Sequence, residues 1–228
     1  MGNYRNARGR NNRNRRGNNN RGRGRGRSRR GRGRGGRNNH SKSNIKREFY
    51  ISSAVKVEET DANTFEGTRF EDFGFNDVIT QNLKQKGFET TTEIQNITIP
   101  KIAEGKDILG ISATGSGKTG AFLIPMIQKM LDDNSQKLMV VAPTRELAVQ
   151  IAKEAISILK GSNLRLVTTI GGESINKPIS QVKRGVNVIV ATPGRLKDLI
   201  DRGVINAYEY NNIVVDEVDR MLDMGFIN

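Results

Sequence analysis

The chain has 228 residues with 38 basic and 24 acidic side chains, a formal net charge of +14, and no cysteine. The lack of cysteine excludes a disulfide framework, thiol catalysis and a zinc ribbon within this sequence. Residues 1–47 hold 18 of the basic residues and none of the acidic ones, so residues 48–228 hold 20 basic and 24 acidic residues. This split excludes a uniformly basic protein of the histone or ribosomal type.

The N-terminal segment, residues 1–47, contains 16 Arg, 11 Asn and 10 Gly, with eight Arg-Gly dipeptides. It cannot bury enough apolar surface to offset its ordering entropy, so we expect a disordered arm. Guanidinium groups pair with phosphate oxygens and stack on bases, which predicts an RG/RGG-type arm that binds nucleic-acid phosphates without sequence specificity. A solubilising tail is the alternative. Acidic residues then mark residues 48–67 as a linker.

Residues 68–228 alternate short apolar runs with helical patterns, which predicts an α/β domain with a parallel sheet. The clearest helical pattern has apolar residues at steps of three and four between Leu147 and Leu159. Ligands of such sheets bind beyond the carboxyl ends of the strands. The predicted strands are 108–111, 138–142, 164–169, 186–191 and 213–215.

A glycine-rich loop follows the first predicted strand and precedes an apolar helix. Its residues are Ser112, Ala113, Thr114, Gly115, Ser116, Gly117, Lys118 and Thr119. The glycines let successive N–H groups face one concavity, and the helix adds its positive N-terminal end. We therefore predict that residues 114–119 bind the phosphates of a nucleotide, with Lys118 on the β- and γ-phosphates and the Thr119 hydroxyl on Mg²⁺. Ser112 occupies the place of the first glycine in the strict pattern.

Adjacent carboxylates follow the last predicted strand, at Asp216 and Glu217. We predict that Asp216 holds Mg²⁺ and that Glu217 positions the attacking water against the γ-phosphate of ATP. Together with Lys118, these two acids are the expected catalytic residues.

These elements, in this order and spacing, resemble the DEAD-box RNA helicases from about Thr68 onward. The resemblance implies a RecA-like P-loop fold that binds ATP and Mg²⁺. Residues 68–96 are similar to the family's Q motif, which implies that Phe70 stacks on adenine and that Gln95 hydrogen-bonds its edge. Thr91 stands where the family usually has proline, and Ser112 where it usually has alanine.

Three loops resemble the family's RNA-binding motifs and imply contacts with the sugar-phosphate backbone of RNA. Each loop follows a predicted strand and offers hydroxyls, glycine N–H groups or an arginine, which bind phosphates and read no base edges. The resemblance also implies that Asp219 couples this domain to a second one. The loop residues are Pro143, Thr144 and Arg145, then Gly171 and Gly172, then Thr192, Pro193, Gly194 and Arg195.

The resemblance implies an ATP-dependent RNA helicase that unwinds short duplexes or remodels RNA–protein complexes, acting as a monomer. The family's second RecA-like domain and its arginines do not occur in this sequence, so we expect this chain alone to hydrolyse ATP negligibly. Two alternatives stay open: a non-enzymatic RNA-binding or RNA-chaperone fragment, and a related helicase ATPase that acts on DNA. No apolar run approaches the ~20 residues that span a bilayer, and no signal peptide is visible, so we expect a cytoplasmic protein without a membrane partner.

Overall fold

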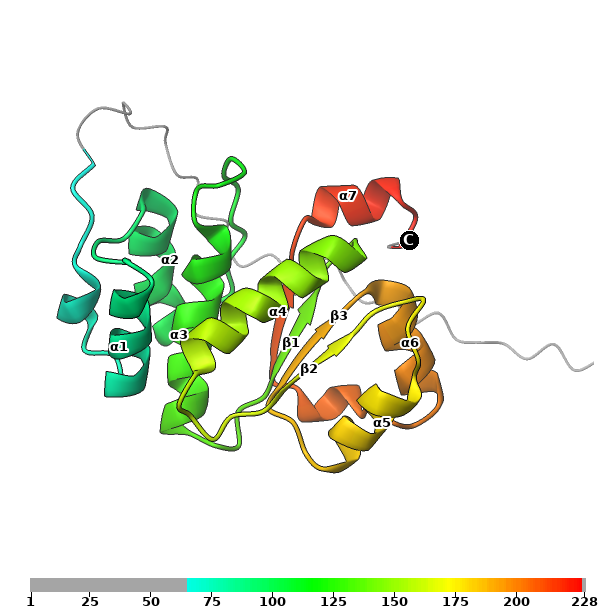
Figure 1. Ribbon diagram of the computed structural model, residues 1–228. Coiled ribbons are helices and arrows are strands. Elements are labelled where there is room, and N and C mark those ends of the chain that lie inside the picture. The colour runs from blue at the N-terminus through cyan, green and yellow to red at the C-terminus, as the bar shows by residue number, and fades with distance from the viewer. Residues whose placement is uncertain (1–64, 227–228) are drawn as a thin grey trace, which may run out of the picture. The chain divides into compact units, whose positions relative to one another are not determined.

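The computed structural model describes residues 65–226 (Figure 1). The predicted basic arm, residues 1–47, lies outside the described residues, as does most of the predicted linker, residues 48–67. The boundaries between arm, linker and domain therefore stay predictions.

Four parallel strands form the sheet, in the order β2-β3-β1-β4. They confirm the predicted parallel α/β fold, and each lies within two residues of a predicted strand. Their bounds are Leu138–Val141 for β1, Leu166–Thr169 for β2, Val188–Ala191 for β3 and Asn212–Val215 for β4.

Helices cover both faces of this sheet. The α-helices are α1 (Asp77–Gln85), α2 (Glu93–Ala103), α3 (Lys118–Asp132), α4 (Arg145–Leu159), α5 (Asn176–Lys183), α6 (Pro193–Asp201) and α7 (Val218–Asp223). Two short 3₁₀ turns, η2 (Phe70–Phe73) and η3 (Ala207–Glu209), complete the described elements. Figure 1 shows α1 to α4 gathered on one side of the strands and α5 and α6 on the other.

The alternation of side chains along each strand creates two apolar clusters. In β1, Leu138 and Val140 pack into the cluster with α1, α3 and α4. Met139 points the other way and packs into the cluster with α6. The inner strand β3 is buried along its whole length, as a strand covered on both faces should be. The sheet is therefore a buried platform whose functional groups must lie at its edges.

The strand predicted for residues 108–111 does not form, and this prediction was wrong. These residues belong to an extended segment that pairs with no strand of the described chain. Leu109 is 66% exposed and Ile111 is 87% exposed. A strand needs a partner for its backbone groups, but a cavity of about 200 Å³ lies between this segment and the nearest edge strand, β4.

Among the helices of residues 65–226, none has both the length and the apolar content that crossing a membrane requires.

The outer edge of β4 leads to a testable prediction about aggregation. Ile213 is 60% exposed on this edge strand, and unpaired apolar edges recruit further strands. Replacing Ile213 with lysine should reduce concentration-dependent aggregation of the chain, measured by light scattering. Ile156→Lys is the matched control, because Ile156 is 55% exposed but lies on α4. An equal reduction in both variants would show that added charge, and not the edge, is responsible.

Candidate functional site

The carboxyl ends of the four strands lie in step at one edge of the sheet. Val141 pairs with both Ala191 and Val215, and Ala191 also pairs with Thr169. The residue after each strand therefore reaches the same edge. Backbone hydrogen bonds continue past the strand ends, since the Asp216 N–H donates to the Val141 carbonyl at 2.9 Å. The acidic motif and the three predicted RNA-binding loops follow these strand ends, whereas the glycine-rich loop follows the unpaired segment 108–111.

The glycine-rich loop closes on itself in this structure. Lys118 Nζ donates to the carbonyl oxygens of Ser112 and Ala113, the second at 3.0 Å. The hydroxyls of Ser112 and Ser116 lie 2.7 Å apart across the loop. Gly115 and Gly117 have φ angles of 82° and 97°, in the region that favours glycine. Helix α3 begins at Lys118, so its N-terminal end faces this loop.

Lys118 and Asp216 line the same cavity of about 200 Å³, with apolar residues of α2, α3 and β4 around them. Partial burial raises the pKa of the Asp216 carboxyl, and the negative charges of Glu217 and Asp219 add to the rise. The Lys118 ammonium and the Glu217 N–H oppose it, the latter through a hydrogen bond of 3.0 Å to Oδ1. The structure thus brings the loop lysine and the first acid of the acidic motif together.

Glu217 and Thr119 do not line this cavity. The Glu217 carboxylate pairs with Arg220 at 3.3 Å instead. Glu217 is also the only non-glycine among residues 65–226 with a positive φ, at 50°. Such strain is uncommon away from functional sites, because the surrounding fold must maintain it. Asp219 is exposed on the first turn of α7.

Gln95 connects the start of α2 to the glycine-rich loop. Its side chain is 4% exposed. Oε1 accepts from the Thr92 N–H at 3.0 Å in a capping box, and Nε2 donates to the Gly117 carbonyl at 3.0 Å. The expected bonds to adenine are therefore replaced by bonds within the protein at both ends of the amide. Each end keeps one further bonding position, so adenine recognition by Gln95 stays a prediction.

Phe70 is 2% exposed, and its ring packs against Phe88 and Phe73 at centroid distances of 6.1 and 6.4 Å. A ring this buried has no free face for adenine in this structure. In this structure Phe70 packs η2 against Phe88, which follows α1 in the chain. Stacking on adenine would require the ring to turn outward.

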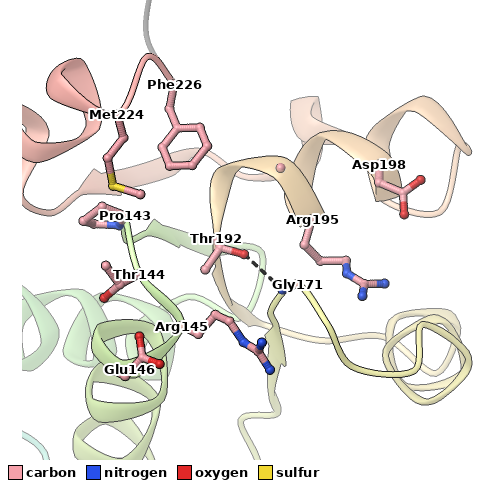
Figure 2. Close-up of a pocket in the computed structure, with 11 residues that line it drawn as sticks. Pro143, Thr144, Arg145, Glu146, Gly171, Thr192, Arg195, Asp198, Met224 and Phe226 are labelled. Carbon is pink, nitrogen blue, oxygen red and sulfur yellow. Dashed lines mark hydrogen bonds between the residues drawn. The ribbon is translucent and has the colours of Figure 1, made fainter.

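A second, wider cavity of about 560 Å³ opens at the same edge of the sheet (Figure 2). It collects residues from all three predicted RNA-binding loops, although Gly172 and Pro193 do not line it. The lining residues from the predicted set are Pro143, Thr144, Arg145, Gly171, Thr192, Gly194 and Arg195. The first turns of α4 and α6 both begin here, which places two positive helix ends at this cavity.

Arg145 and Arg195 lie on either side of the loop that contains Gly171 (Figure 2). The Arg145 guanidinium lies over Gly172, where a Cβ atom would meet Nη1 at 2.6 Å. Arg195 Nη2 donates to the Glu173 carbonyl at 2.6 Å. The Thr192 hydroxyl accepts from the Gly171 N–H at 3.3 Å. Glycine at 172 thus makes room for one arginine, while Thr192 fixes the loop beside the other.

Sequence reasoning missed four residues that line the second cavity, namely Glu146, Asp198, Met224 and Phe226. The Asp198 carboxylate pairs with Arg202 at 2.6 Å. Met224 and Phe226 line the side of the cavity near Pro143 (Figure 2). Nothing in the sequence indicated that Met224 and Phe226 would line this cavity, because only folding brings the segment after α7 close to Pro143.

The chemistry of the first cavity fits a Mg²⁺–nucleotide. Mg²⁺ is usually held by one or two carboxylates together with phosphate oxygens and water. Residues 65–226 contain no cluster of three or more metal-binding side chains. Asp216, which lines the cavity, and Thr119, which follows Lys118 in the first turn of α3, would be the protein's ligands. The loop glycines and the N-terminal end of α3 suit the phosphates themselves.

The raised pKa of Asp216 leads to a prediction about stability and pH. A carboxyl whose pKa is higher in the folded state destabilises the fold when it ionises, so stability falls as pH rises from the ordinary value of 3.8 through the raised one. Asp216→Asn should therefore unfold at a higher temperature than wild type at pH 7, with the difference vanishing below the ordinary value. Thermal unfolding between pH 3 and pH 8 measures this. Asp223→Asn, which removes an exposed carboxylate from α7, is the matched control for the loss of a negative charge.

The contact between Gln95 and the loop leads to a second prediction. A Cβ at Gly117 would lie 2.7 Å from Gln95 Nε2, whereas a Cβ at Gly115 would meet nothing within 4 Å. Both positions have a positive φ, so both alanine variants share that strain. Gly117→Ala should therefore lose about 1–3 kcal/mol more free energy of unfolding than Gly115→Ala, measured by urea denaturation. Adding Gln95→Ala to Gly117→Ala should recover part of the loss, and equal losses for the two glycines would contradict the contact.

Comparisons with known proteins agree with this geometry. Residues 92–228 match the DEAD/DEAH box helicase family. The chain is 40% identical over 162 residues to the ATP-dependent RNA helicase CshA of Listeria monocytogenes, covering 71% of this chain and 31% of that protein. It is 41% identical over 162 residues to the DEAD-box ATP-dependent RNA helicase CshA of Bacillus cereus, covering 70% of this chain and 31% of the relative. The chain thus spans about a third of the length of these curated relatives.

Two solved structures extend the likeness to the fold. The crystal structure of a DEAD box protein from the hyperthermophile Methanococcus jannaschii matches with a TM-score of 0.66 and 38% identity, over 70% of this chain and 44% of that one. A hypothetical ATP-dependent RNA helicase from Sulfolobus tokodaii matches with a TM-score of 0.61 and 38% identity, over 66% and 44%. On the family match and these identities, the chain belongs to the DEAD-box RNA helicases of the DEAD/DEAH box helicase family.

Proposed function

We propose that this chain supplies the nucleotide-binding domain of an ATP-dependent RNA helicase and half of its RNA-binding surface. The observation that carries the proposal is the presence of two chemically different cavities at one edge of a parallel sheet. One holds two lysines and two carboxylates, Lys118 and Asp216 among them. The other holds two arginines, two carboxylates, hydroxyls, glycines and two helix N-termini. ATP with Mg²⁺ fits the first cavity, and a nucleic-acid backbone fits the second.

Lys118 of the first cavity would neutralise the β- and γ-phosphates. Asp216 would hold Mg²⁺ together with Thr119, which lies outside the lining at the start of α3. The bound ion would draw charge from the phosphates as the terminal phosphate leaves. The Glu217 carboxylate would position the attacking water once its ion pair with Arg220 is broken. The strained backbone of Glu217 supports this role, since it fixes the direction in which the carboxylate leaves the strand end.

The second cavity supports RNA binding without sequence specificity. Arg145 and Arg195 offer guanidinium forks, and Gly171 and Gly194 let the backbone approach closely. These groups suit phosphate oxygens and sugars and contact no base edges. The basic arm, residues 1–47, would add affinity of the same sequence-independent kind.

We also propose that this chain alone turns over ATP very slowly. Within the described part of the chain, no arginine lines the cavity that holds Lys118 and Asp216. An arginine that stabilises the transition state is worth about 10³–10⁵ in rate for this class of reaction. This chain should therefore bind ATP, but fast hydrolysis would need such an arginine from outside this cavity.

An RNA-binding assay with single-stranded poly(U) tests the proposal. Arg145→Ala with Arg195→Ala should weaken binding and reduce the log–log salt slope by about 1.4, since each lost phosphate contact removes about 0.7. Arg184→Ala is the control, because this exposed arginine ends α5 at the opposite edge of the sheet. The arm contributes equally to every variant, so differences between variants report the cavity.

Four further results bear on the proposal and its alternatives. Poly(dT) should bind less tightly than poly(U) to the cavity, and equal loss of both on Arg145→Ala would favour a DNA-acting relative. Mg²⁺–ATP should bind to wild type and not to Lys118→Ala. An unchanged salt slope in the double arginine variant would contradict RNA binding at this cavity, and RNA binding without any nucleotide binding would favour the non-enzymatic fragment.

A further inference from the structure

The first residue of the glycine-rich loop makes two contacts that the proposed function does not use. Ser112 Oγ lies 2.7 Å from Ser116 Oγ, so one hydroxyl donates to the other across the loop. The Ser112 carbonyl also accepts from Lys118 Nζ. Ser112 is half-buried, which shields the hydroxyl pair from water more than a surface pair. The residues usual at this position, glycine in the general phosphate-loop pattern and alanine in the helicase family, have no hydroxyl.

Four hydrogen bonds join residues of the loop to one another, the Lys118–Ser112 bond among them, and together they hold the loop closed. The Ser112–Ser116 pair joins its first and fifth residues. The Ser116 N–H donates to the Ala113 carbonyl at 3.4 Å, and Lys118 Nζ donates to the same carbonyl at 3.0 Å. The ammonium that should meet the phosphates is thus held by the carbonyls of its own loop. Phosphate binding requires Lys118 to leave these carbonyls and the loop to open.

We propose that Ser112 is a positioning residue that stabilises this self-bonded loop and thereby weakens nucleotide binding. The inference rests on the proposed function, because it takes ATP as the ligand of the loop. The hydroxyl pair forms in the self-bonded loop and competes with phosphate for the same segment. A protein whose competent state is only fractionally populated binds its ligand more weakly by that fraction. Removing the Ser112 hydroxyl therefore raises the competent fraction.

The test is the binding of Mg²⁺ and N-methylanthraniloyl-ATP to the intact 228-residue chain, measured by fluorescence at equilibrium and by stopped flow. Ser112→Ala should bind between about twofold and tenfold more tightly, the range that one net hydrogen bond supplies. The gain should appear in the association rate, with the dissociation rate unchanged, because the variant alters the free loop. A variant that merely damaged the fold would bind more weakly and dissociate faster.

Matched variants keep the result specific. Ser112→Thr keeps the hydroxyl and should bind as wild type does. Ser135→Ala removes a hydroxyl from an exposed turn outside the loop and should also leave affinity unchanged. In a Ser116→Ala background the pair is already broken, so Ser112→Ala should add no further gain. Thermal unfolding of each variant checks that the fold is retained.

The outcomes separate the two proposals. Equal or weaker binding by Ser112→Ala, or a gain that persists in the Ser116→Ala background, would overturn the role of Ser112 while wild-type binding upholds the nucleotide site. Wild type that fails to bind Mg²⁺–ATP at saturating concentration would overturn the nucleotide site and the inference with it.

Discussion

The parallel register of four short strands is the constraint on which both cavities depend. Because each strand ends in step with its neighbours, the segments after β1, β2, β3 and β4 leave the sheet along one line. Helices α4 and α6 start from that line, so their positive ends accumulate on the side where phosphates would bind. An antiparallel sheet would send alternate loops to opposite edges and could not assemble such a site.

Two groups of the first site are placed at a cost in folding stability. Asp216 is partly desolvated, and Glu217 holds a left-handed backbone. Neither arrangement favours folding by itself. Gln95 offsets part of this by bonding to α2 at one end and to the glycine-rich loop at the other. A single buried amide therefore ties the least regular part of the site to a helix with a well-formed cap.

Four of the five strands expected from the sequence form, and so does the helix expected between Leu147 and Leu159, because the burial of these elements follows a local period. The Leu147–Leu159 pattern is buried in α4 just as its spacing implied. Residues 108–111 are equally apolar, but a strand also needs a neighbouring strand to pair with. The spacing of apolar residues along the chain does not show whether such a partner exists. Phe70 shows the same limit, since its burial against Phe88 depends on the return of a distant segment. The expectation that ligands bind at the carboxyl ends of parallel strands predicted that the three RNA-binding loops would meet. It did not predict that the Gln95 amide would donate to the Gly117 carbonyl.

The order of the strands also sets the distance between the two proposed ligands. Asp216 follows β4, Pro143 follows β1, Thr192 follows β3 and Gly171 follows β2, which is their order across the sheet. Neighbouring strands are about 4.8 Å apart, so the whole array spans about 15 Å. The hydrogen bond from Asp216 N–H to the Val141 carbonyl joins the acidic strand end to the strand that leads into Pro143. One backbone hydrogen bond therefore connects the acidic strand end to the strand that leads into the wall of the second cavity.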